Sequence, residues 1–161
     1  MRGNMLHVLC FGNRLHGDDG VGPMVASHLL DENLPTQMKV FDCGVAGLNA
    51  LPFFSGCSYV LMIDAYDLGE AAGSWRYLDV DEVINLDNQV EDHNGGLSYL
   101  LNAVKALVEP CPELALIGVQ IESVRSFHPE LSSPVENAID TVKKEVLRVV
   151  QCRSHAVSAH E

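Results

Sequence analysis

Short apolar runs and amphipathic stretches alternate along most of the chain. The apolar runs are nearly continuous, which is typical of strands that are covered on both faces. The expected strands lie at residues 8–11, 38–41, 59–63 and 114–119. Residues 75–80 alternate enough for an edge strand, whereas the acidic stretch 81–90 is expected to form a loop. Helical spacing occupies much of the chain between these runs, so the sequence predicts a single-domain α/β fold. We expect a mostly parallel, twisted sheet of about five strands with helices on both faces.

The last helix has the clearest start in the sequence. Ser133 is in position to cap it, Pro134 suits its first turn, and Glu136 completes a capping box. The helical pattern then continues to about residue 150, after which the polar end of the chain has no periodicity. We therefore expect a folded domain at residues 1–150 and a flexible C-terminal tail at residues 151–161.

The composition narrows the class of partner. The 161 residues suit one domain, and 47% of them are hydrophobic, which is enough for a core. The formal net charge of −12 argues against nucleic acids and anionic membranes, because both require a basic face. No apolar run approaches the roughly 20 residues of a membrane span, and the N-terminus lacks the pattern of a signal peptide. Five scattered cysteines without a Cys-x-x-Cys pair favour a reducing cytoplasm over a disulfide framework or a structural zinc site.

The stretch from Leu6 to Gly22 joins a strand, a polar loop and the start of a helix. Two adjacent carboxylates, Asp18 and Asp19, stand directly before that helix. In an open α/β sheet such a loop lies at the carboxyl end of its strand, where ligands usually bind. Either aspartate alone is explained by capping the helix and interacting with its dipole. The surrounding glycines suggest, in addition, a backbone that something must approach closely. They are Gly12, Gly17, Gly20 and Gly22.

Two further polar groups occupy comparable places. Asp64 ends the apolar run that begins at Tyr59, where a buried carboxylate is costly unless it is paired or liganded. His93 precedes a helix. Together with Asp19 they form a suitable ligand set for a divalent metal, because the carboxyl ends of neighbouring parallel strands share one edge. Each also has a plainer explanation, as a helix cap, an acceptor of backbone hydrogen bonds or a solvated residue.

Motifs for other common chemistries are absent or weak. The glycines lack the order of a dinucleotide-binding or phosphate-binding loop, and the Gly-x-Ser-x-Gly of many hydrolases is absent. Cys43, after the second expected strand, offers a nucleophile with His93 as its base. A small thiol at a strand end is, however, more often simply packed in the core.

Four groups of residues match one known pattern when they are taken together and in order. They are Gly12-Asn13-x-Leu15-x-x-Asp18-Asp19-Gly20-x-Gly22, then Asp42-x-Gly44-x-x-Gly47, Asp64-Ala65 and His93. In a chain of this size, this combination, from about Leu6 to Val150, resembles the hydrogenase maturation proteases.

The resemblance implies an activity and a set of site residues. Members are endopeptidases that remove a short C-terminal extension from the large-subunit precursor of [NiFe] hydrogenase, after nickel has been inserted, and their fold is a twisted sheet flanked by helices. Carried over to this chain, the metal contacts are Asp19, Asp64 and His93. Asp19 is then the first candidate for a general base, with Asp18 in reserve. The expected substrate contacts are Gly12, Asn13, Asp42 and Gly44.

Two alternatives stand beside the protease. One is a nickel-binding maturation chaperone of the same fold that does not cut its partner, and the other is a thiol hydrolase that uses Cys43. For the protease we expect the nickel to be supplied by the precursor, a monomeric state and a cytoplasmic location. Where some members have Gly-Gly after the second strand, this chain has Cys43-Gly44, so Cys43 either contacts the metal or packs in the core.

Overall fold

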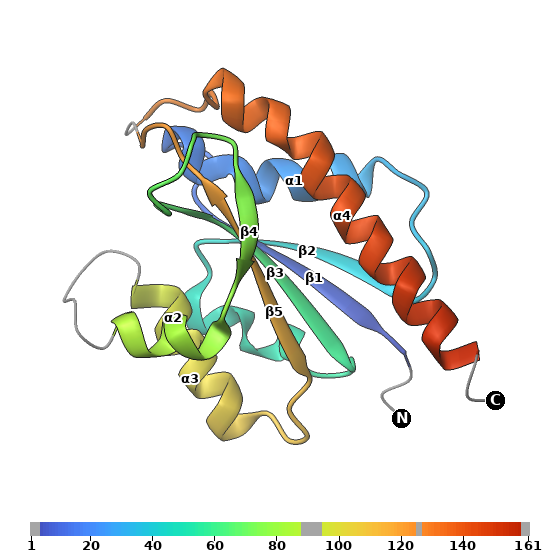
Figure 1. Cartoon of the computed structure of the whole chain (residues 1–161). Coiled ribbons are helices and arrows are strands. Elements are labelled where there is room, and N and C mark those ends of the chain that lie inside the picture. Colours follow the sequence, from blue (N-terminus) through green and yellow to red (C-terminus); the bar gives the residue numbers. More distant parts are fainter. Residues whose placement is uncertain (1–3, 88–94, 125–126, 159–161) are drawn as a thin grey trace.

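The computed structural model of this chain describes residues 4–87, 95–124 and 127–158. One five-stranded sheet lies between two layers of helices (Figure 1). Its strands, in chain order, are β1 (Leu6–Phe11), β2 (Met38–Gly44), β3 (Tyr59–Tyr66), β4 (Trp75–Leu78) and β5 (Glu113–Gln120). They lie side by side in the order β2-β1-β3-β5-β4, and only β4 runs antiparallel to its neighbour. The predicted single-domain α/β fold with a mostly parallel sheet is confirmed.

Helices cover both faces of the sheet, as predicted. The helical elements are η1 (Gly17–Gly20), α1 (Val21–Leu30), η2 (Gly47–Phe54), α2 (Val80–Asp87), α3 (Gly95–Leu107) and α4 (Ser133–Ser158). Helices α1 and α4 lie on one face, and η2, α2 and α3 on the other (Figure 1). Successive residues of a strand point to opposite faces. Leu61 therefore packs in the core beneath α1 and α4, which we call the first core, and Met62 packs in the core beneath η2, α2 and α3, which we call the second core. Burial on both sides explains why the central strands are continuously apolar.

The parallel strands place their carboxyl ends at one edge of the sheet, which we call the carboxyl edge. Cys10 of β1 lies opposite Asp42 of β2 and Ile63 of β3. Just beyond, the backbone N–H of Gly12 donates to the carbonyl of Gly44 at 2.9 Å. The ends of β1, β2 and β3 and the loops that follow them therefore meet here, and they carry the predicted site residues that the structure describes.

The acidic stretch expected to be a loop contains most of helix α2, so that prediction is wrong for residues 81–87. Asp79 caps the start of the helix: its carboxylate accepts hydrogen bonds from the backbone N–H groups of Asp81 (2.9 Å) and Glu82 (3.1 Å). Val83 is buried against the second core. An Asp followed three residues later by a Glu is a recognised helix-start signal, and that signal is present in the sequence.

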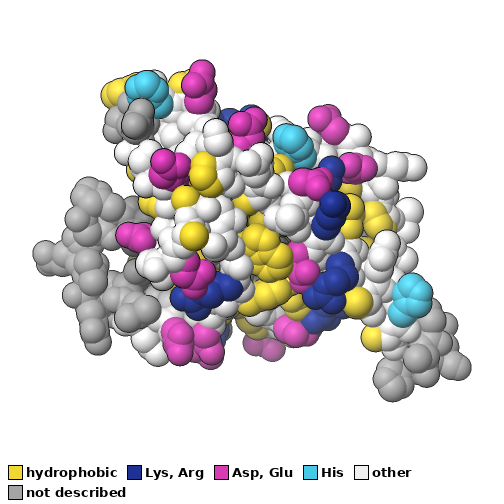
Figure 2. Space-filling view, turned by 45° about the horizontal axis from the view of Figure 1, so that its top comes forward, with side chains coloured by type: hydrophobic (Ala, Val, Ile, Leu, Met, Phe, Trp, Pro, Cys, Tyr) yellow, Lys and Arg dark blue, Asp and Glu magenta, His cyan; other side chains and the backbone are white. Residues whose placement is uncertain are grey.

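The sheet exposes β4 as an edge strand, and charged groups surround it. Arg76 forms an ion pair with Glu70 at 2.9 Å, and Tyr77 donates to Glu145 of α4 at 2.7 Å. Figure 2 shows one face of the molecule, on which charged side chains of both signs surround a central group of hydrophobic side chains. Short, charged edges of this kind discourage pairing with another strand.

None of the helices in the described ranges combines the length and apolar character that a membrane crossing needs.

Helix α4 continues to Ser158, although a flexible tail was expected from residue 151. Two contacts hold the additional turns against the sheet. The Arg153 guanidinium bonds to the Glu113 carboxylate at 2.6 Å and lies 3.5 Å from the centre of the Tyr59 ring. Both partners are distant in sequence, so no local pattern revealed them.

We expect Arg153→Ala to fray the last two turns of α4 without disturbing the rest of the fold. The substitution removes a cation–π contact and an exposed ion pair, which together contribute about 1 kcal/mol. Amide hydrogen exchange should then accelerate in residues 151–158 and stay unchanged in β1 and β3. Unchanged exchange in α4 would contradict this anchoring role.

Candidate active site

The loop after β1 folds back against the start of α1 so tightly that two glycines have no room for a side chain. A Cβ atom on Gly12, whose φ is +138°, would lie 1.9 Å from the backbone oxygen of Asp19. A Cβ on Gly22 would lie 2.2 Å from the carbonyl oxygen of Phe11. The close approach suggested by the glycines is therefore made by the protein's own backbone, and it fixes Asp19 against the end of β1.

Asp19 lies in η1, directly before α1, and is half-buried. Its Oδ2 atom accepts a hydrogen bond from the backbone N–H of Asn13 at 3.0 Å. The explanation of this residue as a helix cap is wrong, because α1 has Gly20 at its N-cap and no side-chain capping bond. The carboxylate is instead held across the loop, toward the carboxyl edge.

Asp64 reaches the same edge from the centre of the sheet. It lies in β3, opposite Gly118 of β5, and accepts the backbone N–H of Ala65 at 2.8 Å. Burial raises the pKa of Asp64 well above its usual range, and the negative charge of Asp19 raises this pKa further. The two carboxylates are therefore close enough to repel each other. No Lys, Arg or His of the described ranges forms an ion pair with either one.

Two uncompensated carboxylates at an open edge provide hard oxygen ligands and a negative potential, which suit a divalent cation. The described ranges contain no group of three or more metal-ligating side chains. His93, the third predicted ligand, lies outside the described residues. The structure thus brings together two members of the predicted set, Asp19 and Asp64.

Asp18 has a different environment from its neighbour. It is 1% exposed and accepts four hydrogen bonds: from the backbone N–H groups of Glu122 (2.8 Å), Ser123 (3.1 Å) and Ser132 (2.7 Å) and from the Ser132 hydroxyl (2.8 Å). These bonds outweigh the effect of burial and lower the pKa of Asp18. The carboxylate therefore joins η1 to the segment between β5 and α4, which favours a structural role over the reserve role of general base.

The partner of Asp18 also changes the expected start of α4. The helix begins at Ser133, so the residue before it is Ser132, whose hydroxyl donates to Asp18. The residue before the helix is thus Ser132 and not the predicted Ser133, and its side chain bonds to the Asp18 carboxylate of η1.

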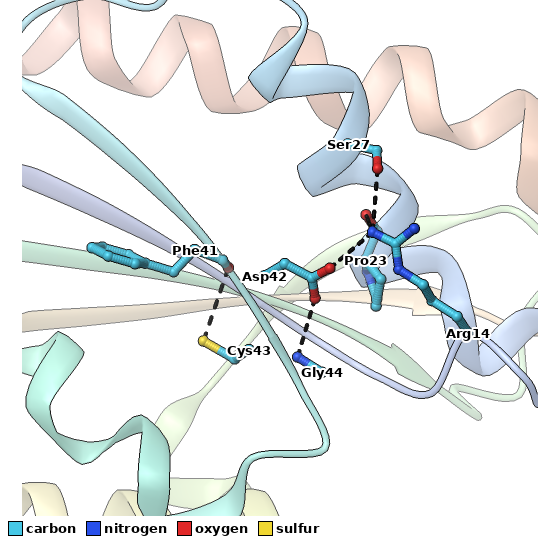
Figure 3. Close-up of polar contacts among 7 residues, drawn as sticks. All are labelled: Arg14, Pro23, Ser27, Phe41, Asp42, Cys43 and Gly44. Atoms are coloured by element: carbon cyan, nitrogen blue, oxygen red, sulfur yellow. Dashed lines mark hydrogen bonds and ion pairs between the residues drawn. The ribbon is translucent and has the colours of Figure 1, made fainter.

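Asp42, predicted to contact substrate, lies in a polar network at the end of β2 (Figure 3). One carboxylate oxygen accepts the backbone N–H of Gly44 at 3.2 Å, and the other accepts Arg14 Nη2 at 2.8 Å. The same Nη2 group lies 3.3 Å from the carbonyl of Pro23 and 3.2 Å from the hydroxyl of Ser27. Sequence reasoning missed Arg14, although a cation inside the glycine-rich loop of an acidic chain was an available signal.

A second organiser that the sequence did not reveal is Gln120, at the end of β5. Its side-chain oxygen accepts the backbone N–H groups of Leu68 (2.5 Å) and Glu70 (3.2 Å), and its amide donates to Asp67 at 3.3 Å. Gln120 is buried and so holds the loop that follows Asp64.

The Cys43 thiol lies at the carboxyl edge but is not activated. Its Sγ atom donates weakly to the carbonyl of Phe41 at 3.9 Å (Figure 3). Burial and the charge of Asp42 raise the pKa of Cys43 to about 12, so the nucleophilic thiolate is scarce at neutral pH. The geometry therefore favours packing over nucleophilic chemistry.

We accordingly expect Cys43→Ala to cleave substrate at the wild-type rate. Iodoacetamide should modify the exposed Cys111 and Cys152 and leave activity intact, as intact mass and a cleavage assay would show. Loss of activity in parallel with alkylation of Cys43 would restore the thiol hydrolase alternative.

Comparison with known proteins agrees with the fold and with the resemblance drawn from the motifs. Residues 23–149 match the HycI family, described as hydrogenase maturation protease. The chain is 30% identical over 137 residues to the hydrogenase 3 maturation protease of Escherichia coli, covering 84% of each protein. It is 33% identical over 141 residues to a putative hydrogenase maturation protease of Methanocaldococcus jannaschii, covering 84% of this chain and 90% of the relative.

A solved structure, the hydrogenase maturating endopeptidase HybD from E. coli, superposes with a TM-score of 0.79 at 28% identity. It covers 91% of this chain and 92% of that one. A match over most of the sequence, with the same fold and with two carboxylates at the expected edge, leads to one assignment: this chain belongs to the hydrogenase maturation proteases and is an endopeptidase.

Proposed function

We propose that this endopeptidase removes the C-terminal extension of a [NiFe] hydrogenase large-subunit precursor once nickel has been inserted. The observation that carries the proposal is the convergence of Asp19 and Asp64, two half-buried carboxylates without a cationic partner in the described ranges. Such a pair favours a substrate that brings its own cation. Precursor without nickel then lacks the group that these carboxylates bind, which makes cleavage depend on the loaded state.

The two carboxylates take different roles in this proposal. Asp64 contacts the precursor-held nickel, together with Asp19 and the predicted His93. When bound, the metal supplies Lewis acidity toward the scissile carbonyl. Asp19 uses Oδ2 to accept the Asn13 N–H at 3.0 Å, whereas its Oδ1 has no hydrogen-bond partner among the described residues. That oxygen is available to accept a proton from the attacking water.

Exposed hydrophobic side chains around the carboxyl edge support a protein substrate. Phe127 is 84% exposed and Val45 75% exposed, and they lie in the loops that follow β5 and β2. Leu15, in the loop after β1, is also exposed. Apolar groups of this kind commonly mark protein–protein contacts. The backbone N–H of Gly12 already donates to the carbonyl of Gly44. We therefore expect the exposed side chains nearby to make the contact with substrate, and this contact stays a prediction.

The decisive experiment follows the intact mass of a large-subunit precursor with and without nickel. Loss of one C-terminal peptide, only from the loaded precursor, is expected. A stable complex with unchanged mass would favour the chaperone, and cleavage of both forms would remove nickel dependence from the proposal. The same samples, run on a sizing column, test the expected monomer. We further propose that the protein acts in the cytoplasm, where exposed thiols such as those of Cys111 and Cys152 are kept reduced.

A further inference from the structure

We infer that Arg14, Gly20, Met24 and Pro129 form a subsite for the segment that the protease cuts. In this inference the subsite buries one apolar side chain of the precursor, and Arg14 donates a hydrogen bond to a peptide carbonyl of the same segment. The inference rests on the proposed function, and it adds a substrate contact that the predicted site residues do not include.

The subsite is a cavity of about 190 Å³ lined by these four residues. The cavity adjoins the loop that carries Asp19, and two of its lining residues come from that loop. Gly20 directly follows Asp19, and Arg14 directly follows Asn13, whose N–H holds the Asp19 carboxylate. A peptide that presents its scissile bond to Asp19 therefore lies beside the loop that lines this cavity.

The walls of the cavity suit an apolar side chain. Met24 is half-buried and packs against the core beneath α1. Pro129 supplies a rigid apolar surface from the loop after β5. Gly20 lets the two sides of the loop approach closely, because a Cβ there would lie 3.1 Å from the Cα atom of Arg14. The volume accommodates a branched aliphatic side chain, and the one charged lining group, Arg14, is already paired with Asp42.

Arg14 is held in place before any substrate binds. Its Nη2 group has three acceptors, on Pro23, Ser27 and Asp42 (Figure 3). Its Nε and Nη1 groups have no hydrogen-bond partner in the described part of the chain, and the side chain is 49% exposed. Such a pre-ordered donor loses little entropy when it binds a ligand.

The charge of Arg14 decides which acceptor it prefers. Asp42 lies 2.8 Å away and neutralises the guanidinium. A second carboxylate would have to compete with Asp42 in a chain of net charge −12, whereas a neutral carbonyl can accept from Nη1 with the ion pair intact. A peptide carbonyl, followed or preceded by an apolar side chain, is therefore the ligand that the subsite fits.

The test measures kcat/KM for nickel-loaded precursor with three variants. Arg14→Met removes the donor, Pro129→Asp places a charge in the cavity wall, and Arg148→Met is the matched control. Arg148 is also ion-paired, with Glu145 at 2.5 Å, but it lies well past Ser133, the start of α4, which is the end of that helix beside Asp18. We expect kcat/KM to fall about 10- to 100-fold for the first two, mainly through KM, and to stay unchanged for the control. Melting temperatures exclude misfolding of any variant.

A charge swap makes the assignment specific. Each apolar residue beside the cleaved bond of the precursor is replaced in turn by Lys. At one position the substitution should slow wild-type cleavage and restore cleavage by Pro129→Asp. Wild-type kinetics for both subsite variants, or a fall in kcat alone, would overturn the subsite. A loss for Arg14→Met that disappears when the precursor's terminal carboxylate is amidated would overturn the carbonyl assignment. An inactive wild-type protein would instead reject the proposed function.

Discussion

Replacing Asp64 with Asn is expected to abolish precursor cleavage and, at the same time, to leave the protein at least as stable as wild type. The amide is isosteric with the carboxylate and keeps an oxygen that can accept the Ala65 N–H. What it loses is the negative charge. Since that charge is raised in free energy by burial and by Asp19, its removal relieves repulsion in the folded state.

The loss of activity should be large, because the proposed reaction relies on this carboxylate directly. We expect kcat/KM on loaded precursor to fall by about 10²- to 10⁴-fold, the usual range for a group acting at the reacting centre. Asp31→Asn, an exposed acid after α1, is the matched control and should cleave normally. Thermal unfolding at pH 7 gives the second readout. Activity retained by Asp64→Asn would reject the site, whereas joint loss of activity and stability would indicate a structural role.

The convergence of Asp19 and Asp64 was predictable, because it follows from topology. Continuous apolar runs at β1 and β3 indicate buried parallel strands, and such strands share a carboxyl edge. Helix α2 was predictable too, since Asp79 and Glu82 carry its start signal in the local sequence. Both features can be predicted from local patterns, namely the continuous apolar runs in the first case and the Asp–Glu spacing in the second.

The roles of Asp18 and Asp19 could not be separated from the sequence. The two residues are adjacent and chemically identical, and each was open to the same explanation as a helix cap. Their difference comes from Ser132, which lies 114 residues from Asp18 and bonds to it through two groups. Arg153 is a similar case, because Glu113 is 40 residues away. Contacts of this range leave no periodicity, so they require the folded structure.

The folded structure in turn predicts that Asp18→Ala is the most destabilising of the changes considered for this site. Truncation leaves the N–H groups of Glu122, Ser123 and Ser132 without their acceptor in a buried position. The cost should be about 3–5 kcal/mol of unfolding free energy, as for other buried charged networks that lose one partner. Urea denaturation at pH 7 measures it, with Asp31→Asn as the control for an exposed acid.

The pH dependence of this difference identifies its cause. Folding lowers the pKa of Asp18 below its value in the unfolded chain, which is about 3.9. The carboxylate therefore contributes its full stability above about pH 4 and loses it as the pH falls through the native pKa. The gap in unfolding free energy between wild type and Asp18→Ala should accordingly narrow on acidification, while the gap for a purely steric defect would stay constant. Asp18 anchors the turn that carries Asp19, so an Asp18→Ala protein that still folds should also cleave its substrate more slowly. Asp18→Asn cannot accept all four hydrogen bonds, and its stability should lie between those of wild type and Asp18→Ala. An Asp18→Ala protein with wild-type stability at pH 7 would mean that these hydrogen bonds contribute nothing to holding Asp19 in place.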